Sequence, residues 1–291
     1  MLRSMTGYGR AESTCNDKLF IVELRSLNGK QFDLLMKPPP QMKPYEFEVR
    51  SMLSDQLLRG SIECTVSIRQ NGAAKPSAIN LELMGSYYRQ LKSLSSELGA
   101  DDSQLLASIL RLPEVVASTS DTLSEDEWKV LSSTISQALE MINRHREDEG
   151  RVLEEELLLR IGNIEQLQKK VIELEPLRKV KIRENLLKLL EEYAGKEQVD
   201  MNRFEQELIY YLEKIDLTEE QVRLANHCQY FRSLLAEKEL AKGRKLSFLL
   251  QEIGREINTT GSKAYDALIQ KSVVEMKDEL EKAKEQVLNA L

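Results

Sequence analysis

Two glutamates on one face of a predicted helix are the strongest candidates for chemistry. Glu252 and Glu256 stand four residues apart in a stretch with helical spacing, so their side chains share one side. With a third carboxylate or a histidine from a neighbouring element, they could hold a hard divalent ion such as Mg²⁺ or Mn²⁺. Such an ion activates water and neutralises charge that develops at a phosphodiester. Glu205, Glu207 and His227 are the candidates for the remaining ligands.

Each of these residues also has a simpler interpretation. The glutamate face could be a solvated helix surface with salt bridges of small energetic worth, and His227 could be a structural histidine. Both alternatives stay open on spacing alone. Arg255 lies beside the two glutamates and Lys245 lies two turns earlier, and residues 242–263 hold five basic and two acidic side chains. This stretch therefore opposes the overall charge of the protein.

The helical pattern breaks over residues 258–263, between two strongly periodic stretches. We expect a loop here that opens the final helix, with backbone N–H groups, hydroxyls and Lys263 available to contact phosphates. The alternative is a plain turn in which Ser262 caps the last helix.

A second group of basic residues lies near the N-terminus. It comprises Arg3, Arg10, Arg25 and Lys30, on predicted strands or their turn, with Tyr8 among them. A basic sheet face that carries an aromatic side chain can bind single-stranded nucleic acid, whereas scattered surface charge is the alternative. The formal net charge of −7 averages unlike segments, because residues 1–75 carry +3, residues 76–140 carry −6 and residues 141–291 carry −4.

The composition excludes several classes of site. Two histidines and three widely spaced cysteines, Cys15, Cys64 and Cys228, argue against a zinc hydrolase, a disulfide framework or a CxxC redox site. The glycine-rich phosphate loop, GxGxxG, GxSxG and HExxH patterns are missing from the sequence. No apolar stretch approaches the roughly 18 residues of a membrane span, and the first residues lack an apolar signal core. We expect a cytoplasmic protein that does not enter membranes.

The elements that must position these residues fall into two groups, and the first is a sheet. Residues 18–28 are rich in strand formers and residues 61–70 alternate apolar with polar side chains. Asn28 and Gly29 predict a hairpin turn over residues 27–30, and residues 45–58 have helical spacing. The pattern predicts an antiparallel β-β-β-α-β unit.

The second group is helical. We expect helices over residues 80–98 and 124–146, the latter with a capping box of Ser124 and Glu127. A long coiled-coil-like helix follows from residue 150, kinked or interrupted at Pro176. Further helices are expected around residues 204–215, from Thr218 as a cap to a stop at Gly243, and over 246–257. A heptad seam over residues 269–287 must pack against a helix of this chain or of a partner, which makes an oligomer plausible.

These elements predict an α+β protein in three parts. They are an N-terminal α+β domain over residues 1–148, a long helical connector over 149–200, and a C-terminal helical domain with the candidate active site over 201–291.

Long motifs at both ends of the chain resemble the bacterial YicC/YloC family. They include Arg203-Phe204-Glu205-Gln206-Glu207 and the run from Gly243 through Glu252. Gly29, Ser247 and Gly254 depart from residues that are frequent in the family, which affects details of the site rather than membership. The resembling segments are residues 1–10, 23–28, 59–63, 203–208, 216–227, 243–252, 255–259 and 262–263.

The resemblance implies a cytoplasmic, metal-dependent endoribonuclease that acts on single-stranded RNA, takes part in small-RNA turnover and assembles as a ring-like homo-oligomer, a hexamer. The candidate glutamates and His227 lie inside the resembling motifs, and from their chemistry we expect Glu252, Glu256 and His227 to be catalytic and Glu205, Glu207, Glu252 and Glu256 to be ligands of Mn²⁺ or Mg²⁺. The expected RNA-binding residues are Arg3, Arg25, Arg244, Lys245, Arg255 and Lys263.

Two other functions compete with this one. The first is a non-catalytic RNA-binding adaptor that presents small RNAs to another nuclease of the RNA-degradation machinery. The second is a purely structural coiled-coil assembly, which predicts no salt-dependent affinity for RNA.

Overall fold

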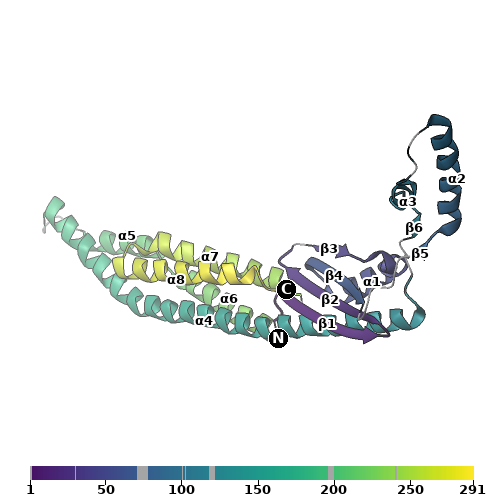
Figure 1. Ribbon diagram of the computed structural model, residues 1–291. Coiled ribbons are helices and arrows are strands. Elements are labelled where there is room, and N and C mark those ends of the chain that lie inside the picture. The colour runs from purple at the N-terminus through teal and green to yellow at the C-terminus, as the bar shows by residue number, and fades with distance from the viewer. Residues whose placement is uncertain are drawn as a thin grey trace.

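The computed structural model describes residues 2–29, 31–70, 78–99, 101, 103–117, 122–195, 200–239 and 241–291. The molecule is long, with a β-sheet in its middle, a helical bundle on one side and a small helical arm on the other (Figure 1). This is the α+β class that the sequence predicts.

The sheet holds four strands in the order β1-β2-β4-β3. The strands are β1 (Gly7–Cys15), β2 (Lys18–Leu27), β3 (Phe32–Lys37) and β4 (Gly60–Gln70). β1, β2 and β4 pair antiparallel, but β3 pairs parallel with β4. The prediction of a wholly antiparallel sheet is therefore wrong, because helix α1 (Glu46–Leu57) carries the chain back to the starting end of β3 before β4 begins.

The hairpin predicted at residues 27–30 is also wrong. β2 and β3 are not neighbours, and the tight turn lies instead between β1 and β2, where Asn16 has a φ of 52°. The Asn28 side chain donates a hydrogen bond of 2.7 Å to the carbonyl of Leu288. The segment after β2 thus joins the sheet to the C-terminal end of the chain.

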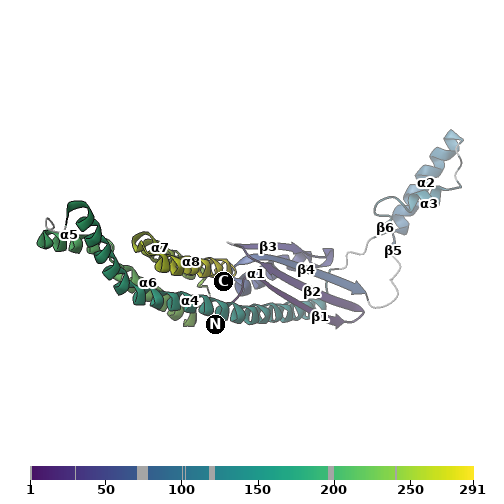
Figure 2. The same cartoon turned by 90° about the vertical axis from the view of Figure 1, so that its left-hand side faces the viewer.

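One face of the sheet is covered and the other is open. Alternate residues of β2 and β4, such as Phe20, Leu24 and Ile62, pack against α1 and the first third of α4 (Glu125–Ala194). Figure 2 shows α4 running beneath the sheet and on into the bundle. A 3-10 helix (Pro40–Tyr45) leads into α1.

Helix α4 unites the two halves of the molecule. Its capping box is confirmed, since Ser124 and Glu127 exchange side-chain and backbone hydrogen bonds at 3.1 and 3.3 Å. The helix contains Pro176 without interruption and curves toward its far end (Figure 2). Its buried residues belong to the sheet core up to Ile142 and to the bundle core from Leu153. The expected boundary after residue 148 lies between these points, within an unbroken helix.

The bundle consists of α4, α6 (Thr218–Ala236), α7 (Gly243–Ala264) and α8 (Ala267–Val287), and α5 (Met201–Lys214) lies at its far end (Figure 1). The heptad seam of α8 is buried within this chain, against α4 and α7. The predicted cap at Thr218 is wrong, because Leu217 is the cap position and makes no side-chain capping bond. The stop predicted at Gly243 is wrong as well, since α6 ends at Ala236 and Gly243 begins α7.

The two ends of the described chain meet where the sheet joins the bundle. Ser4 forms a β-bridge with Ala290, and the Leu291 N–H donates to the Arg3 carbonyl at 2.9 Å. Leu2 is fully buried in the bundle core. Residues from the two extremes of the sequence therefore build the joint between the halves.

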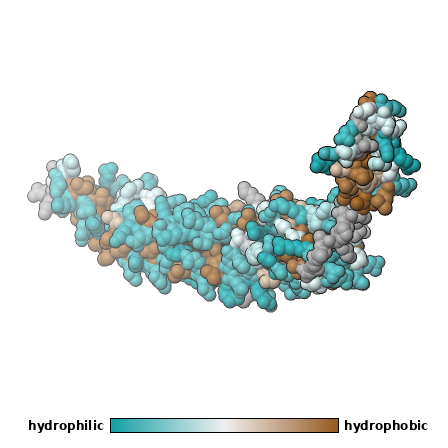
Figure 3. Space-filling view, in the orientation of Figure 1, coloured by the Kyte–Doolittle hydropathy of each residue, from teal (hydrophilic) through white to brown (hydrophobic). Residues whose placement is uncertain are grey.

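The arm projects from the sheet domain on a short two-stranded stalk, β5 (Ala78–Ile79) and β6 (Val116–Ala117), and carries α2 (Leu81–Leu98) and α3 (Leu105–Ile109) (Figure 1). α2 has no buried residue within the described chain. Figure 3 shows apolar side chains gathered at the base of the arm.

Candidate active site

Helix α7 positions most of the residues expected to do chemistry. It begins where the backbone N–H groups of Lys242 and Gly243 both donate to the Leu291 carbonyl, at 3.0 and 2.9 Å. A Cβ at position 243 would lie 2.3 Å from the Ala290 carbonyl oxygen, so only glycine fits this close approach. The apolar side of α7, including Leu250, is buried in the bundle core. This burial fixes which side chains face outward.

The loop predicted over residues 258–263 is wrong, because these residues form the last turns of α7. Their hydroxyls bond back to the helix: Thr259 donates to the Arg255 carbonyl at 3.1 Å and Ser262 donates to the Thr259 carbonyl at 2.9 Å. The helix ends instead at Tyr265, and the Asp266 side chain caps α8, not Ser262. The backbone N–H groups of this segment are consequently engaged within the helix rather than open to a phosphate.

The two central glutamates differ in their surroundings. Glu252 is partly exposed and its carboxylate lies 3.2 Å from the Arg255 guanidinium. Glu256, one turn later, is only 4% exposed, yet within the described residues its carboxylate makes neither an ion pair nor a hydrogen bond. The carboxylate oxygens of Glu256 are not among the side-chain atoms that are fully buried without a partner, so they reach the surface of the bundle, and no neighbour in the described chain engages them.

His227 lies on α6, half-buried, opposite the same part of α7. The Gln221 side chain on α6 donates to Thr260 Oγ1 on α7 at 3.3 Å, and the two helices are antiparallel. His227 stands six residues past Gln221, about 9 Å along the axis, which brings it level with residue 254 on α7. Along the neighbouring helix, His227 therefore lies at a height midway between Glu252 and Glu256.

The other expected metal ligands lie on α5. Glu205 pairs with Arg183 at 2.5 Å, and Glu207 is exposed. Across the part of the chain that the structure describes, no group of three or more His, Cys, Asp or Glu side chains is close enough together to hold a metal ion. The structure does not bring the α5 glutamates, the α7 glutamates and His227 into one such group.

A divalent ion nevertheless suits part of this arrangement. Mg²⁺ is commonly bound by one or two protein carboxylates together with waters and substrate phosphates, rather than by a complete protein cage. The unpartnered Glu256 carboxylate and Glu252 one turn away provide such a pair on one helix. These two residues fit the metal role better than Glu205, whose carboxylate is already paired.

Lys263 is partly buried, and its ammonium is engaged by neighbours at the edge of the bundle. Its ammonium donates to Glu220 Oε1 at 2.8 Å and to the Asp216 carbonyl at 3.1 Å. Burial by itself raises the pKa of Asp216, but hydrogen bonds from Lys179 and Thr218 outweigh this and lower that pKa to about 2. Lys263 thus belongs to an ion-pair network between α4, α6 and α7.

Arg178 on α4 is a site-positioning residue that sequence reasoning missed. Its guanidinium is 2% exposed and donates to the carbonyls of Lys263 and Ala264 at 2.8 and 2.9 Å, to that of Ile215 at 2.6 Å, and to Glu175 at 2.8 Å. A cation at the C-terminal carbonyls of a helix is favourable because it opposes the negative end of the dipole. Its position directly after Pro176 and Leu177 in a charged run gave no signal of this role.

The basic residues of the N-terminal domain lie in two different places. Arg3 pairs with Glu147 where the sheet meets the bundle, whereas Arg25 is exposed on the open sheet face, 5.8 Å from the centre of the Tyr8 ring. Arg10 on that face pairs with Glu12 and Glu23, which neutralise part of the charge. Lys30 lies outside the described residues.

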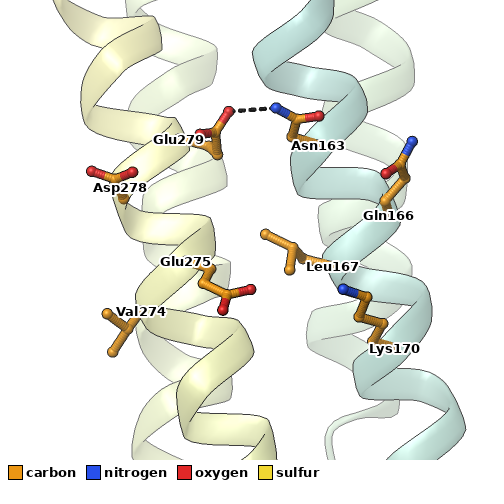
Figure 4. A pocket seen from close by; sticks show the side chains of 8 residues that line it. All are labelled: Asn163, Gln166, Leu167, Lys170, Val274, Glu275, Asp278 and Glu279. Carbon is orange, nitrogen blue, oxygen red and sulfur yellow. Dashed lines mark hydrogen bonds between the residues drawn. The ribbon is translucent and has the colours of Figure 1, made fainter.

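Grooves flank α4 on two sides, but neither holds an expected site residue. The groove between α4 and α8, of about 560 Å³, is lined by Asn163, Lys170, Glu275 and Glu279 among others (Figure 4). Glu279 accepts a hydrogen bond of 2.7 Å from Asn163 and pairs with Arg160 at 3.1 Å. Burial alone raises its pKa, yet these bonds and one from a lysine lower it to about 2.

Two of the three cysteines are unsuited to nucleophilic chemistry. Cys64 and Cys228 are buried, and burial raises the pKa of each thiol to about 12. Since the thiolate is the reactive form, both residues act as packing groups at neutral pH.

Two family descriptions match the chain almost from end to end. Residues 2–155 match "Endoribonuclease YicC-like, N-terminal region", and residues 171–290 match "Endoribonuclease YicC-like, C-terminal". The chain belongs to the YicC-like endoribonuclease family. It is similar to the probable endoribonuclease YicC of Clostridioides difficile, at 31% identity over 300 residues, and to that of Haemophilus influenzae, at 31% over 293 residues. In both comparisons 99% of each chain is covered.

Membership in the YicC-like family accounts for the motifs at both ends of the chain, which the fold places in the sheet domain and in the helical bundle. In the described residues, no helix of this YicC-like chain is both long and apolar enough to cross a bilayer.

Proposed function

We propose that this YicC-like chain is a metal-dependent endoribonuclease that cleaves phosphodiester bonds of single-stranded RNA. The observation that carries the proposal is Glu256, a residue only 4% exposed whose carboxylate makes no ion pair within the described residues and stands one turn from Glu252. A carboxylate that no neighbour engages is open to a cation, and carboxylates one turn apart on a helix can bind the same ion. The printed names of the two relatives, each a probable endoribonuclease, agree in chemical class.

The proposed roles follow from where each side chain lies. Glu252 and Glu256 would hold the divalent ion, Mn²⁺ or Mg²⁺, which supplies charge neutralisation at the phosphodiester and a more acidic bound water. His227, midway in height between Glu252 and Glu256 on the adjacent helix, is the proposed proton carrier because histidine is the side chain most often used for general acid–base catalysis. The exposed Arg244 and Arg255 bind the RNA backbone.

Two of the expected RNA-binding residues receive smaller roles. Lys263 positions the end of α7 through Glu220, and Lys245 is exposed but paired with Glu239 at 2.5 Å. Arg25 and Tyr8 on the open sheet face form a second, separate contact surface for single-stranded RNA.

The test is cleavage of a labelled single-stranded RNA by purified protein with Mn²⁺ or Mg²⁺ and with a chelator. We expect cleavage that depends on the metal and falls at least 100-fold, about 2.7 kcal/mol in activation free energy, in Glu252→Gln and Glu256→Gln. The matched control is Glu275→Gln on α8, an exposed glutamate away from the proposed site. Cleavage that persists in the chelator, or that both glutamine variants retain in full, refutes the proposal.

A second candidate is the non-catalytic RNA-binding adaptor. It is favoured by one observation, that the described residues hold no three-ligand metal group. The same experiment separates the two functions, because an adaptor binds RNA with salt-dependent affinity while wild type and Glu256→Gln show equal, background cleavage.

We further propose a homo-oligomer, a hexamer, that works in the cytoplasm in small-RNA turnover alongside RNA-degradation machinery. Support for association comes from the arm, whose Leu81 and Leu98 are 75% and 72% exposed. Large exposed apolar side chains on a projecting element favour contact with another protein surface. Sedimentation of the wild type and of Leu81→Ser/Leu98→Ser tests this, and a monomeric wild type contradicts it.

A further inference from the structure

The solvent face of α7 carries six exposed side chains in a straight line along the helix. Their spacing of 4, 3, 4, 3 and 4 residues keeps them on one side for about 27 Å. We call this line the α7 stripe, and it consists of Arg244, Phe248, Gln251, Arg255, Asn258 and Ser262.

The composition of the α7 stripe is unlike that of an ordinary solvated helix face. It holds two guanidinium groups and no carboxylate, in a chain with 48 acidic and 41 basic residues. The exposed face of the neighbouring α8 shows the ordinary pattern of mixed charges, at Lys271, Glu275, Asp278, Lys282 and Glu285. The positive character of the α7 stripe is therefore a local property and not the protein average.

Phe248 is the least expected member of this line. Its side chain is 65% exposed, between Arg244 one turn before it and Gln251 one turn after it. A single exposed aromatic is common on protein surfaces, but here it is flanked along the same face by cationic and amide groups. This combination matches a ligand with both flat apolar faces and negative charge.

A partner helix fits the α7 stripe poorly. A helix–helix seam requires apolar side chains repeating every three or four residues, and Phe248 is the only apolar residue among the six. Single-stranded nucleic acid fits well, because its bases stack on aromatic rings and its phosphates and base edges bind guanidinium and amide groups. Charge complementarity therefore selects the nucleic acid.

The guanidinium groups of the stripe are available for such a ligand. Arg244 makes no ion pair within the described residues, and Arg255 is 71% exposed with one surface contact to Glu252. Exposed pairs of this kind are weak and exchange readily with other anions. Glu252 also lies directly beside the stripe, so a strand bound along it passes the proposed active site.

We propose that the α7 stripe is a track for single-stranded RNA, in which Phe248 stacks on a base while Arg244 and Arg255 contact the flanking phosphates. This inference deepens the proposed function and rests on it. It adds Phe248 as the residue that recognises unpaired bases.

The test measures the affinity of fluorescently labelled 12-nucleotide oligouridine by anisotropy in a chelating buffer, where metal-dependent cleavage does not interfere. Phe248→Ala should weaken binding about 5- to 100-fold, and Phe248→Trp should restore it. Binding of a fully paired RNA duplex should change less than twofold, because stacked bases leave no face for the ring. The double variant Arg244→Gln/Arg255→Gln should reduce the slope of log Kd against the logarithm of the salt concentration by about 1 to 2.

The matched control is Val274→Ala, which removes an apolar side chain 64% exposed on α8. Both truncated side chains are exposed, so the thermal melts of the two variants should match wild type. If wild-type protein binds no RNA, the proposed function and the track fail together. If wild type binds and cleaves RNA while Phe248→Ala binds as tightly as Val274→Ala, the track alone is wrong. Loss of self-association in Phe248→Ala with unchanged RNA affinity would identify the face as a protein interface and also overturn the proposal.

Discussion

Replacing Arg178 with methionine should destabilise the helical bundle by about 4 kcal/mol. The guanidinium donates to three backbone carbonyls at 2.6 to 2.9 Å and to Glu175 at 2.8 Å. The Arg178 side chain is almost completely buried from solvent. Hydrogen bonds to charged groups contribute about 1.5–3 kcal/mol each. The free energy that arginine loses when it leaves water offsets part of the combined contribution of these hydrogen bonds. Removing one partner of a buried pair costs about 3–5 kcal/mol overall.

The assay is thermal and urea unfolding followed by helical circular dichroism. At about 2–4 °C per kcal/mol, the melting temperature of the bundle should fall by about 8–16 °C. The matched control is Arg223→Met, because Arg223 forms a comparable helical pair with Glu219 that is exposed on both sides. That substitution should cost less than about 0.5 kcal/mol.

A second variant tests the electrostatic part of the argument. Glu175→Gln/Arg178→Met should be more stable than Arg178→Met by about 1 kcal/mol, because it removes a carboxylate that the single change leaves with only the longer 3.6 Å contact to Lys179. One oxygen of Glu175 is already buried without a hydrogen-bond partner. If Arg178→Met is no more harmful than Arg223→Met, the guanidinium does not secure the end of α7 and the reasoning is refuted.

Three further results are expected. Folding lowers the pKa of Asp216 to about 2, from an unfolded value of about 4. The ionised carboxylate therefore stabilises the fold above the unfolded pKa, and this stabilisation is lost as the pH falls from about 5 to 2. Asp216→Asn should flatten this part of an acid denaturation curve. Gly150→Ala should prevent stable folding, because the added Cβ would lie 2.1 Å from the Leu2 carbonyl oxygen. The control is Gly85→Ala, where the added Cβ meets open space and should raise the stability of the helix by about 0.5–1 kcal/mol in thermal melts. Glu256→Gln should melt at the same or a higher temperature than wild type while losing cleavage; a lower melting temperature would show that the charged carboxylate stabilises the fold.

Patterns that depend on near neighbours were readable from the sequence. The alternation of residues 61–70 predicts a strand with one buried face, and β4 has this form. Ser124 and Glu127 predict a helix start, and the capping box is present. In both cases the decisive contacts lie within a few residues along the chain or follow from a regular period.

Features that depend on distant partners were not readable. Asn28 and Gly29 have the local chemistry of a hairpin, but Asn28 instead bonds to Leu288, and the parallel pairing of β3 follows from the path through α1. The hydroxyl-rich end of α7 resembles a loop until packing against α6 and α8 holds it helical. The contacts of Arg178 and the exposure of Phe248 likewise depend on tertiary structure.

The joint between the two extremes of the chain has a consequence for protein synthesis. Ser4 pairs with Ala290, and Leu291 donates to Arg3 and accepts hydrogen bonds from the start of α7. In the Ser4–Ala290 and Arg3–Leu291 pairs, the ribosome makes the first partner almost three hundred residues before the second, so the sheet domain emerges with Leu2 and its neighbours still lacking their final contacts. The joint therefore closes only after residues 290 and 291 have been made. A chain interrupted before residue 289 cannot complete it, and its exposed Leu2 would mark it for degradation by cellular quality control.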